Sequence, residues 1–301
     1  MCIRDSLKGE LNCLGIIAFV ILAASISCNV SSTHREQELV DVILVTKNLQ
    51  AGQERISLLV NADLIKDEAP IGKFTIRHTT ESNVMKTQTA HYHRWPYGFR
   101  GAYSADMDFI QPGLWDLELL LQIKGEQHIG RLKLDIAEKL PVPARGEMPP
   151  QSVTPTLYDV EELAFLTTDF SPDPDLYKMS LVDALQDSKP DVIVFSSPAF
   201  CTSPTCGPQV DTLSDLKELY MGEANFIHVE IYDNPSEIQG DVDRLRVVDT
   251  AEEWGFTQLP GWINESWTFV IDSDGEIERR FEGFVTLEEL ESALGSVLKV
   301  S

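Results

Sequence analysis

The chain has 301 residues, a length that predicts about two domains. Its 48 acidic residues against 24 basic ones give a net charge of −24, and a surface this negative repels phosphate backbones, which excludes nucleic acid as a partner. Apolar residues make up 43% of the chain, which is enough to form buried cores.

The first 27 residues have the pattern of an export signal. Arg4 and Lys8 precede an apolar run at residues 14–26. This run is shorter than the roughly 20 apolar residues that a membrane-spanning helix needs, and it is typical of the apolar part of a signal peptide. We therefore expect residues 1–27 to be a signal peptide and the protein to be extracytoplasmic.

The end of this signal resembles a bacterial lipobox. Ser25-Ile26-Ser27 places small residues before Cys28, although Ser25 stands where a lipobox usually has Leu. The resemblance implies that Cys28 is acylated, so that a lipid anchors the chain to the cell membrane and the polar residues 28–37 serve as a tether. Ordinary secretion, with Cys28 incidental, remains the alternative.

Residues 38–138 show the alternation of β-strands. Apolar residues recur at every second position in several short runs separated by turns, which predicts a β-sandwich. These positions are Val40, Val42, Leu44, Ile56, Leu58, Val60, Phe74, Ile76, Trp115, Leu117, Leu119 and Leu121. The segment 109–118 (FIQPGLWDLE) resembles a hairpin of immunoglobulin-like, YtkA/FixH-like exported modules. This resemblance implies an all-β immunoglobulin-like domain.

Two histidines in this region allow a copper site as an alternative to an ordinary strand. His91 and His93 fall on one face of a strand, and Met85 and Met107 are further soft ligands. The simpler interpretation, which we favour, is a polar strand face beside the neighbouring aromatic residues.

Residues 139–157 contain five prolines and predict a semi-rigid linker. From residue 158 to 301, strands alternate with helices. We expect strands at 163–167, 191–196, 226–232, 267–271 and 277–284, and helices at 175–187, 208–221, 235–254 and 286–298. Thr286 and Glu289 have the spacing of a capping box at the start of the last helix.

This order, together with the residues of the closing hairpin, resembles the thioredoxin-like superfamily. Residues 267–283 (WTFVIDSDGEIERRFEG) are similar to the ending of TlpA-like and redoxin-type exported proteins. The resemblance covers about residues 158–300. It implies an α/β thioredoxin-like C-terminal domain after the all-β N-terminal domain.

The cysteines leave one pair in the predicted mature chain. Cys2 and Cys13 belong to the signal and Cys28 to the lipid site, so Cys201 and Cys206 remain. Closing a loop this short removes little entropy from the unfolded chain, so the disulfide stabilises the fold only slightly. This disfavours a purely structural disulfide. In a helix, residues five apart have Cα atoms about 8.5 Å apart, beyond the roughly 7 Å limit for a disulfide. The pair can therefore bond only if the stretch before Cys206 is not helical.

We interpret this pair as the functional centre. Cys206 lies at a predicted helix start, where the helix dipole lowers a thiol pKa, and Cys201 lies in the loop before it. The hypothesis is thiol–disulfide exchange with other exported proteins, with Cys201 as the nucleophile and Cys206 as its resolving partner. No cofactor is expected and no metal ligand is assigned. The supporting residues we assign are Thr202, Pro204, Gly207, Pro208, Ser266 and Trp267.

Several residues differ from the usual thioredoxin pattern, so other functions remain possible alternatives. Q-type peroxiredoxins have a similar Cys-Thr-x-x-x-Cys-Gly motif, in which Cys201 would attack peroxide, but Pro198 stands where they need Ser or Thr. Sco-type copper proteins need a distant His, and His228, which we expect in the core, is a poor match. An inert disulfide in a binding module or metallochaperone is the third alternative. Ser266 occupies the usual cis-proline position, where we expect a trans bond.

Two further expectations concern acidic residues. A buried acid–base partner for the thiols is not evident in the strand 191–196 beyond its first residue. The acidic run 169–175 contains two prolines and lacks the glycine of a calcium loop. We therefore expect it to be a solvated connector.

Overall fold

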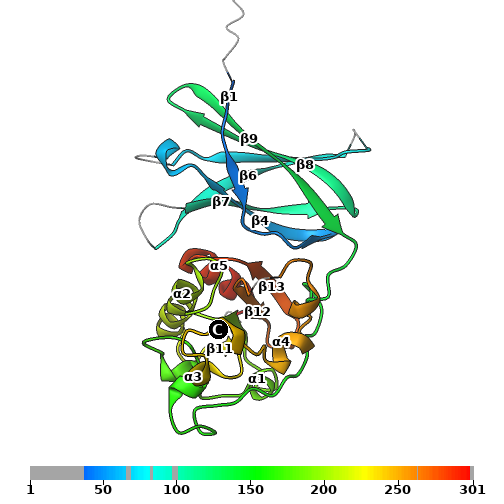
Figure 1. Cartoon of the computed structure of the whole chain (residues 1–301). Helices are drawn as coiled ribbons and strands as arrows, with labels where there is room; N and C mark the ends of the chain where they lie inside the picture. The colour runs from blue at the N-terminus through cyan, green and yellow to red at the C-terminus, as the bar shows by residue number, and fades with distance from the viewer. Residues whose placement is uncertain (1–36, 66–68, 82–83, 97–100, 263, 299–301) are drawn as a thin grey trace, which may run out of the picture. The chain divides into compact units, whose positions relative to one another are not determined.

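The computed structural model describes residues 37–65, 69–81, 84–96, 101–262 and 264–298. These residues belong to one compact unit, Glu36–Ser301. The predicted signal peptide and Cys28 lie outside them. The described part contains a β-rich region up to Ala137 and a mixed α/β region from Leu163 onward (Figure 1). Within it, no helix is both long enough and apolar enough to cross a membrane.

The β-rich region is a large, curled, mainly antiparallel sheet. Its strand order is β1-β9-β8-β5-β6-β7-β4-β2, with β3 paired to β9. Strand β6 joins the two halves, because residues 85–90 pair with β5 and residues 91–94 pair with β7. The strands are β1 (Gln37–Leu39), β2 (Val42–Leu44), β3 (Leu49–Gln50), β4 (Gly52–Val60), β5 (Gly72–His78), β6 (Met85–Arg94), β7 (Gly101–Phe109), β8 (Gly113–Ile123) and β9 (Glu126–Ala137).

Strand β8 shows how the sequence pattern builds the core of this sheet. Its predicted inward residues, Trp115, Leu117, Leu119 and Leu121, are all buried, which confirms the predicted alternation. The strand begins at Gly113, whose φ of +118° favours glycine. A Cβ atom at this position would lie 3.1 Å from Nε2 of His78.

Residues 139–157 contain no helix or strand, but part of the segment is packed against the α/β region. Val142 is fully buried in the core of that region. The N–H of Gly146 donates to the carbonyl of Ile277 at 2.8 Å, and the N–H of Ile277 donates to the carbonyl of Glu147 at 3.0 Å. The segment is thus hydrogen-bonded to the strand that begins at Ile277.

The α/β region contains a four-stranded sheet in the order β11-β10-β12-β13. Strands β10 and β11 are parallel, β12 is antiparallel to β10, and β13 is antiparallel to β12. Helix α2 connects the parallel pair, and α5 follows β13. The elements are α1 (Leu181–Ala184), β10 (Asp191–Ser196), α2 (Cys206–Leu219), β11 (Asn225–Glu230), α3 (Pro235–Ile238), α4 (Asp249–Glu253), β12 (Trp267–Ile271), β13 (Ile277–Glu282) and α5 (Leu287–Val297).

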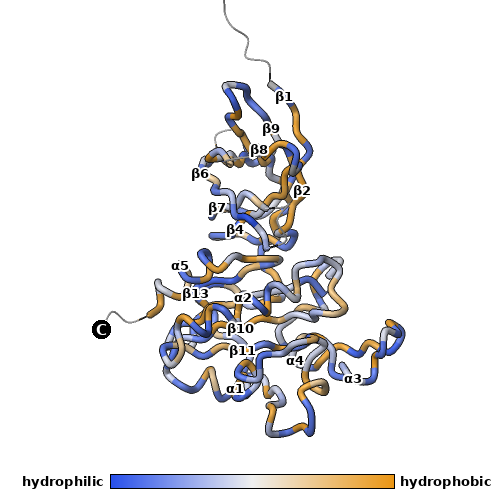
Figure 2. The backbone as a smooth tube through the Cα atoms, turned by 90° about the vertical axis from the view of Figure 1, so that its left-hand side faces the viewer, coloured by the Kyte–Doolittle hydropathy of each residue, from blue (hydrophilic) through white to orange (hydrophobic). Residues whose placement is uncertain are grey.

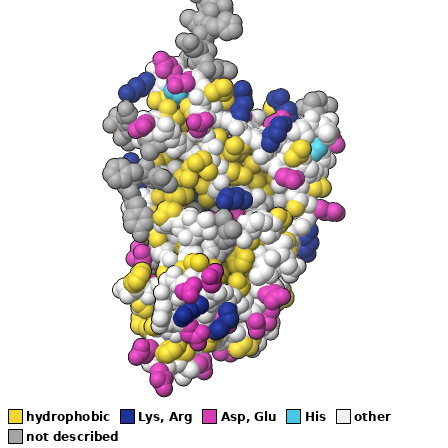
Figure 3. Space-filling view, in the orientation of Figure 1, with side chains coloured by type: hydrophobic (Ala, Val, Ile, Leu, Met, Phe, Trp, Pro, Cys, Tyr) yellow, Lys and Arg dark blue, Asp and Glu magenta, His cyan; other side chains and the backbone are white. Residues whose placement is uncertain are grey.

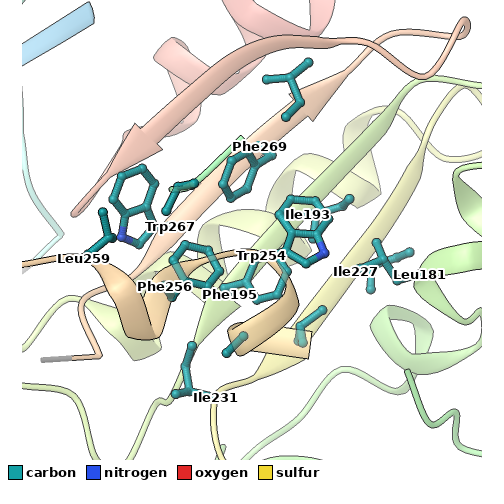
Figure 4. Packing of buried hydrophobic residues seen from close by; sticks show 14 of the residues in the cluster. Leu181, Ile193, Phe195, Ile227, Ile231, Trp254, Phe256, Leu259, Trp267 and Phe269 are labelled. Carbon is teal, nitrogen blue, oxygen red and sulfur yellow. The ribbon is translucent and has the colours of Figure 1, made fainter. Parts of the chain in front are cut away.

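Strand β10 is buried along its whole length, as its continuous apolar run predicts. Figure 2 shows the hydropathy of the residues along the backbone, with β10 labelled. On one face of the sheet its side chains meet a group of aromatic rings (Figure 4). The ring of Phe195 lies 4.7 Å from that of Trp254 and 4.9 Å from that of Phe256, measured between centroids. Trp267 and Phe269 of β12 extend the same cluster. This core fixes the end of β10, from which the cysteine loop departs.

Two predicted elements before β10 are wrong or only partly right. Residues 163–167 do not form a strand; Leu163–Phe165 is a 3₁₀ turn, because the N–H of Leu166 bonds to the carbonyl of Leu163 at 2.8 Å. The predicted helix 175–187 is divided into a 3₁₀ turn, Pro174–Tyr177, and helix α1. Ser180 between them has an extended backbone, with ψ of 151°, and so interrupts the helix.

The long helix predicted at 235–254 is also interrupted. Helix α3 ends where Gln239 and Gly240 adopt positive φ values of 47° and 79°. A 3₁₀ turn at Val242–Arg244 and helix α4 follow. At the C-terminal end, the capping box of Thr286 and Glu289 is confirmed at the start of α5.

Charged side chains connect the β-rich region to the α/β region. Arg55 of β4 donates two hydrogen bonds to Glu289 of α5, at 2.8 and 3.0 Å. Burial opposes ionisation of Glu289, but Arg55 and His93 overcome it and lower the pKa of this carboxyl to about 2. Arg279 of β13 makes a bidentate pair with Asp106 of β7, at 2.9 and 2.6 Å. The two regions therefore meet through specific ion pairs.

Candidate functional site

Cys201 and Cys206 form a disulfide, with their Cα atoms 5.9 Å apart. Residues 201–205 are not helical, and α2 begins at Cys206 itself. This confirms the predicted requirement for a non-helical stretch before the second cysteine. Pro204 lies in the turn of this stretch, and Gly207 and Pro208 lie in the first turn of α2.

The loop that carries the pair starts at the carboxyl end of β10. The hydroxyl of Ser196, the last residue of β10, donates to the carbonyl of Cys206 at 3.1 Å. This bond ties the first turn of α2 to the central strand. Cys206 is fully buried, whereas Cys201 is only partly buried. A molecule approaching from solvent therefore meets Cys201 first.

Asn264, in the loop before β12, holds the cysteine loop in place. Its side-chain carbonyl accepts from the backbone N–H of Thr202 at 3.2 Å and from the Thr202 hydroxyl at 3.1 Å. Its amide donates to the hydroxyl of Tyr232 at 2.7 Å and to the carbonyl of Phe200. The backbone carbonyl oxygen of Asn264 also lies 3.9 Å from the sulfur atoms of both cysteines. One buried side chain thus links the cysteine loop to Tyr232, which follows β11.

Asn264 was not predicted as a site residue, although it lies two positions before Ser266, which was. The residue has a left-handed backbone, with φ of +53°, which Asn adopts more readily than most residues. Ser266 and Trp267 of the same segment have other roles. Ser266 is fully buried and its carbonyl accepts from the N–H of Gly283 at 2.8 Å, and Trp267 belongs to the aromatic core. None of the described peptide bonds is cis.

Glu265 lies beside the same loop. The Ser203 hydroxyl donates to the Glu265 carboxylate, and it lies 2.6 Å from the hydroxyl of Thr205 and 3.7 Å from the sulfur of Cys201. Glu265 and Ser203 are both partly buried. A carboxylate therefore lies next to the disulfide.

An apolar cavity of about 590 Å³ borders the cysteine loop. Its walls include Ile43 and Leu59 of the curled sheet and Trp95 after β6, facing Pro204 and Pro208. Hydrophobic side chains are also gathered on the face of the molecule seen in Figure 3, among surface positions that carry many acidic groups. The cavity provides an apolar surface next to the disulfide loop.

A buried carboxylate is connected to the cysteine loop through hydrogen bonds. Glu230, the last residue of β11, accepts from the N–H and the hydroxyl of Thr168, both at 2.8 Å. The Thr168 hydroxyl oxygen in turn accepts from the N–H of Ala199, in the cysteine loop, at 3.1 Å. Burial raises the pKa of Glu230 to about 7. No buried acid was expected in β10 beyond its first residue, Asp191, which is indeed buried; Glu230 is a second buried acid, at the end of the neighbouring strand.

His228 lies in the core, as predicted. The Tyr177 hydroxyl lies 2.6 Å from its Nδ1, and its Nε2 lies 3.2 Å from the carbonyl of Ser196. Since a carbonyl only accepts, Nε2 carries the proton and Nδ1 accepts from Tyr177. Burial lowers the pKa of His228 to about 4. The imidazole is thus neutral, and both of its nitrogens are hydrogen-bonded.

The structure does not assemble the alternative copper ligands. Met107 is fully buried and Met85 is about half exposed, and Nε2 of His93 faces Glu289 at 3.7 Å. Neither of the metal-compatible His, Cys, Asp and Glu clusters among the described residues includes His91 or His93.

The acidic run 169–175 is partly engaged rather than fully solvated. Lys217 of α2 pairs with Asp173 at 2.7 Å and with Asp175 at 3.2 Å. These ion pairs fasten the run to α2.

Comparisons with known proteins give structural likenesses only. No family model and no curated protein matches the sequence. A thioredoxin-family thiol:disulfide interchange protein from Chlorobium tepidum TLS is similar over 49% of this chain and 99% of that chain, at 13% identity and a TM-score of 0.32.

Two further likenesses cover about a third of the chain each. The chitinase ChiW from Paenibacillus sp. str. FPU-7 is similar over 35% of this chain and 9% of that chain, at 10% identity and a TM-score of 0.24. The CARDB domain of the PF1109 protein from Pyrococcus furiosus is similar over 33% of this chain and 86% of that chain, at 5% identity and a TM-score of 0.17.

Proposed function

We propose that the Cys201–Cys206 pair exchanges disulfides with other exported proteins. In the exchange, a partner thiolate attacks the sulfur of Cys201, the Cys201–Cys206 bond breaks, and Cys206 leaves as a thiolate that takes up a proton. A second partner thiol then attacks the mixed disulfide and releases Cys201. Two electrons and two protons pass to this protein, and the partner gains a disulfide; the reverse sequence reduces a partner disulfide.

The position of the disulfide is the observation that carries this proposal. The bond lies at the first residue of α2 and at the carboxyl end of the central strand. A helix N-terminus stabilises a thiolate, which is the form that attacks and leaves. The partly exposed Cys201 and the buried Cys206 are suited to the roles of attacking and resolving thiol.

A trapping experiment with single variants tests the proposal. In Cys206→Ser, the remaining Cys201 should form a mixed disulfide with partner proteins that persists because no resolving thiol is present. Cys201→Ser is the matched control, and its buried Cys206 should trap far less. Non-reducing gels and mass spectrometry of the trapped adducts give the readout. Equal absence of adducts in both variants, from an extracytoplasmic extract under thiol-blocking conditions, would refute the exchange.

We further propose that the β-rich region is an immunoglobulin-like module and that a lipid on Cys28 anchors the chain outside the cytoplasm. The strand alternation and the hairpin at 109–118 support the module, and the apolar run before Ser27-Cys28 supports export and anchoring. Replacing Cys28 with Ser should release the protein from the membrane fraction. Release of the unaltered protein to the same extent would instead indicate ordinary secretion.

A further inference from the structure

The disulfide and Glu265 together hold three potential metal ligands. The two cysteine sulfur atoms and one carboxylate oxygen of Glu265 all lie within 4.8 Å of one another. They come from three parts of the fold, namely the cysteine loop, the start of α2 and the loop before β12. Two thiolates and a carboxylate are ligands that Zn²⁺ uses in proteins.

The backbone geometry suits such a site once the disulfide is reduced. Tetrahedral Zn²⁺ with Zn–S bonds of about 2.3 Å holds two sulfurs about 3.8 Å apart. The Cα atoms of Cys201 and Cys206 are 5.9 Å apart, so rotation of the side chains is enough to separate the sulfurs to this distance. Four residues lie between the cysteines, within the spacing of two to four that zinc-binding cysteine pairs commonly have.

The surroundings orient the third ligand. The Ser203 hydroxyl donates to the Glu265 carboxylate and also contacts the Thr205 hydroxyl at 2.6 Å. Hydrogen bonds of this kind fix the direction of a ligating carboxylate. The backbone carbonyl oxygen of Asn264 lies 3.9 Å from both sulfurs and is a neutral oxygen atom close to the proposed site. The start of α2 favours the thiolate form that a metal needs.

We propose that reduction converts the Cys201–Cys206 disulfide into a Zn²⁺ site with Glu265 as the third protein ligand. A dithiol supplies two electrons and two protons and becomes a disulfide, or a phosphine supplies two electrons and becomes its oxide while water supplies the oxygen atom and both protons; either route leaves two thiols. Zn²⁺ then displaces both thiol protons and binds the thiolates. The metal and the disulfide exclude each other, so bound Zn²⁺ protects the reduced pair from oxidation. The inference rests on the proposed function only in requiring that the pair can be reduced.

Spectroscopic titration of the full chain tests this site. The protein is reduced with a phosphine, freed of reductant without oxygen, and titrated with Co²⁺, which gives thiolate charge-transfer bands and the visible bands of tetrahedral cobalt. One Co²⁺ per chain should bind and be displaced by Zn²⁺. The oxidised chain and the double variant Cys201→Ser/Cys206→Ser should give no such bands.

Variants of the carboxylate isolate the role of Glu265. Glu265→Gln and Glu265→Ala should each weaken Zn²⁺ binding by more than tenfold, and Ser203→Ala by about tenfold through loss of orientation. Glu223→Gln, a substitution at an exposed carboxylate, is the matched control and should bind like the unaltered chain. Circular dichroism of each variant verifies the fold.

Two outcomes would overturn the inference. One is reduced protein that binds Co²⁺ no more tightly than the double serine variant. The other is affinity within twofold of the unaltered chain in both Glu265 variants, which would remove Glu265 from the site. The mixed-disulfide trapping with Cys206→Ser is a separate measurement. Failure of metal binding with successful trapping therefore leaves the exchange function intact, and the reverse result leaves the metal site intact.

Discussion

The side-chain carbonyl of Asn264 accepts two hydrogen bonds from Thr202, one from its backbone N–H at 3.2 Å and one from its hydroxyl at 3.1 Å. These residues are far apart in the sequence, and the pair fixes the residue that directly follows Cys201. The conformation of the disulfide loop therefore depends on the loop before β12.

Replacing Asn264 should loosen the cysteine loop. Asn264→Gly tolerates the positive φ but removes the hydrogen bonds to Thr202, Tyr232 and Phe200, which we expect to lower the free energy of unfolding by about 2–3 kcal/mol. Reduction of the disulfide by dithiothreitol should become faster. Asn264→Asp keeps the acceptor for Thr202 but places a buried carboxylate oxygen against the carbonyl of Phe200, so it should also destabilise the loop. Denaturant unfolding and reduction kinetics measure both, and equal kinetics in all three proteins would contradict the role of Asn264.

The two cysteines should differ in reactivity after reduction. Cys201 is partly exposed and Cys206 fully buried, so we expect alkylation of Cys201 to be about tenfold faster or more. Quenched alkylation followed by peptide mass spectrometry measures the two rates. The same experiment with hydrogen peroxide tests the peroxidase alternative, which requires rapid sulfenic acid formation on Cys201. Faster modification of Cys206 would reverse the assigned roles.

The buried carboxyl of Glu230 should make stability depend on pH. Its pKa is raised to about 7 from an ordinary value of 4.5, so the folded protein retains a proton that the unfolded chain releases between these values. Stability should thus fall as pH rises from about 4.5 to about 7, by up to about 1.4 kcal/mol per pH unit for this group. Asp191 and Glu282, whose pKa values burial also raises to about 7, act in the same direction.

In the variant Glu230→Gln, the folded protein no longer holds the proton of this carboxyl, so its free energy of unfolding should depend less on pH. Urea unfolding at a series of pH values should show a smaller decline in stability between pH 4.5 and 7 than in the unaltered protein. Glu276→Gln, at an exposed turn, is the control and should keep the full slope. An unchanged slope in Glu230→Gln would show that this carboxyl does not hold the proton.

Glu289 should have the opposite pH dependence. Its pKa is lowered to about 2, so its contribution is present above about pH 4.5 and is lost as pH falls toward 2. Glu289→Gln keeps a side chain able to complete the capping box but leaves Arg55 buried without its partner charge. We expect a loss of about 3–5 kcal/mol at neutral pH, measured by denaturant unfolding.

The neighbouring Glu288 provides the control for this variant. It is exposed on the same turn of α5, and Glu288→Gln should change stability little. If Glu289→Gln and Glu288→Gln were equally stable, the Arg55–Glu289 pair would not stabilise the contact between the two regions.

Local patterns made much of the fold predictable. The alternation in β8, the apolar run of β10 and the capping box of α5 each depend on residues close in sequence, and the structure has these elements where they were expected. The predictions were wrong where contacts with the rest of the fold decide the local backbone conformation. Residues 163–167 have strand-like composition but make turn hydrogen bonds, and Gln239 adopts a left-handed conformation that no periodicity indicates.

The candidate site was predictable in its cysteines but not in its surroundings. The spacing of Cys201 and Cys206 indicated a non-helical loop before α2. Asn264 and Glu230, in contrast, act through hydrogen bonds to residues more than 30 positions away. Such partners follow from the packing of the β10, β11 and β12 ends, which one sequence does not reveal. The left-handed tolerance of Asn was the available signal for Asn264.

The proline-rich segment 139–157 covers one edge of the sheet in the α/β region. β13 is the last strand of its sheet, and such an edge offers free N–H and C=O groups that another chain can extend. Here Gly146 and Glu147 already occupy both backbone groups of Ile277, and Arg280 donates to the carbonyls of Val142 and Pro143. A fragment that began after this segment would expose a template for intermolecular β-pairing. The proline-rich connection thus also serves as edge protection.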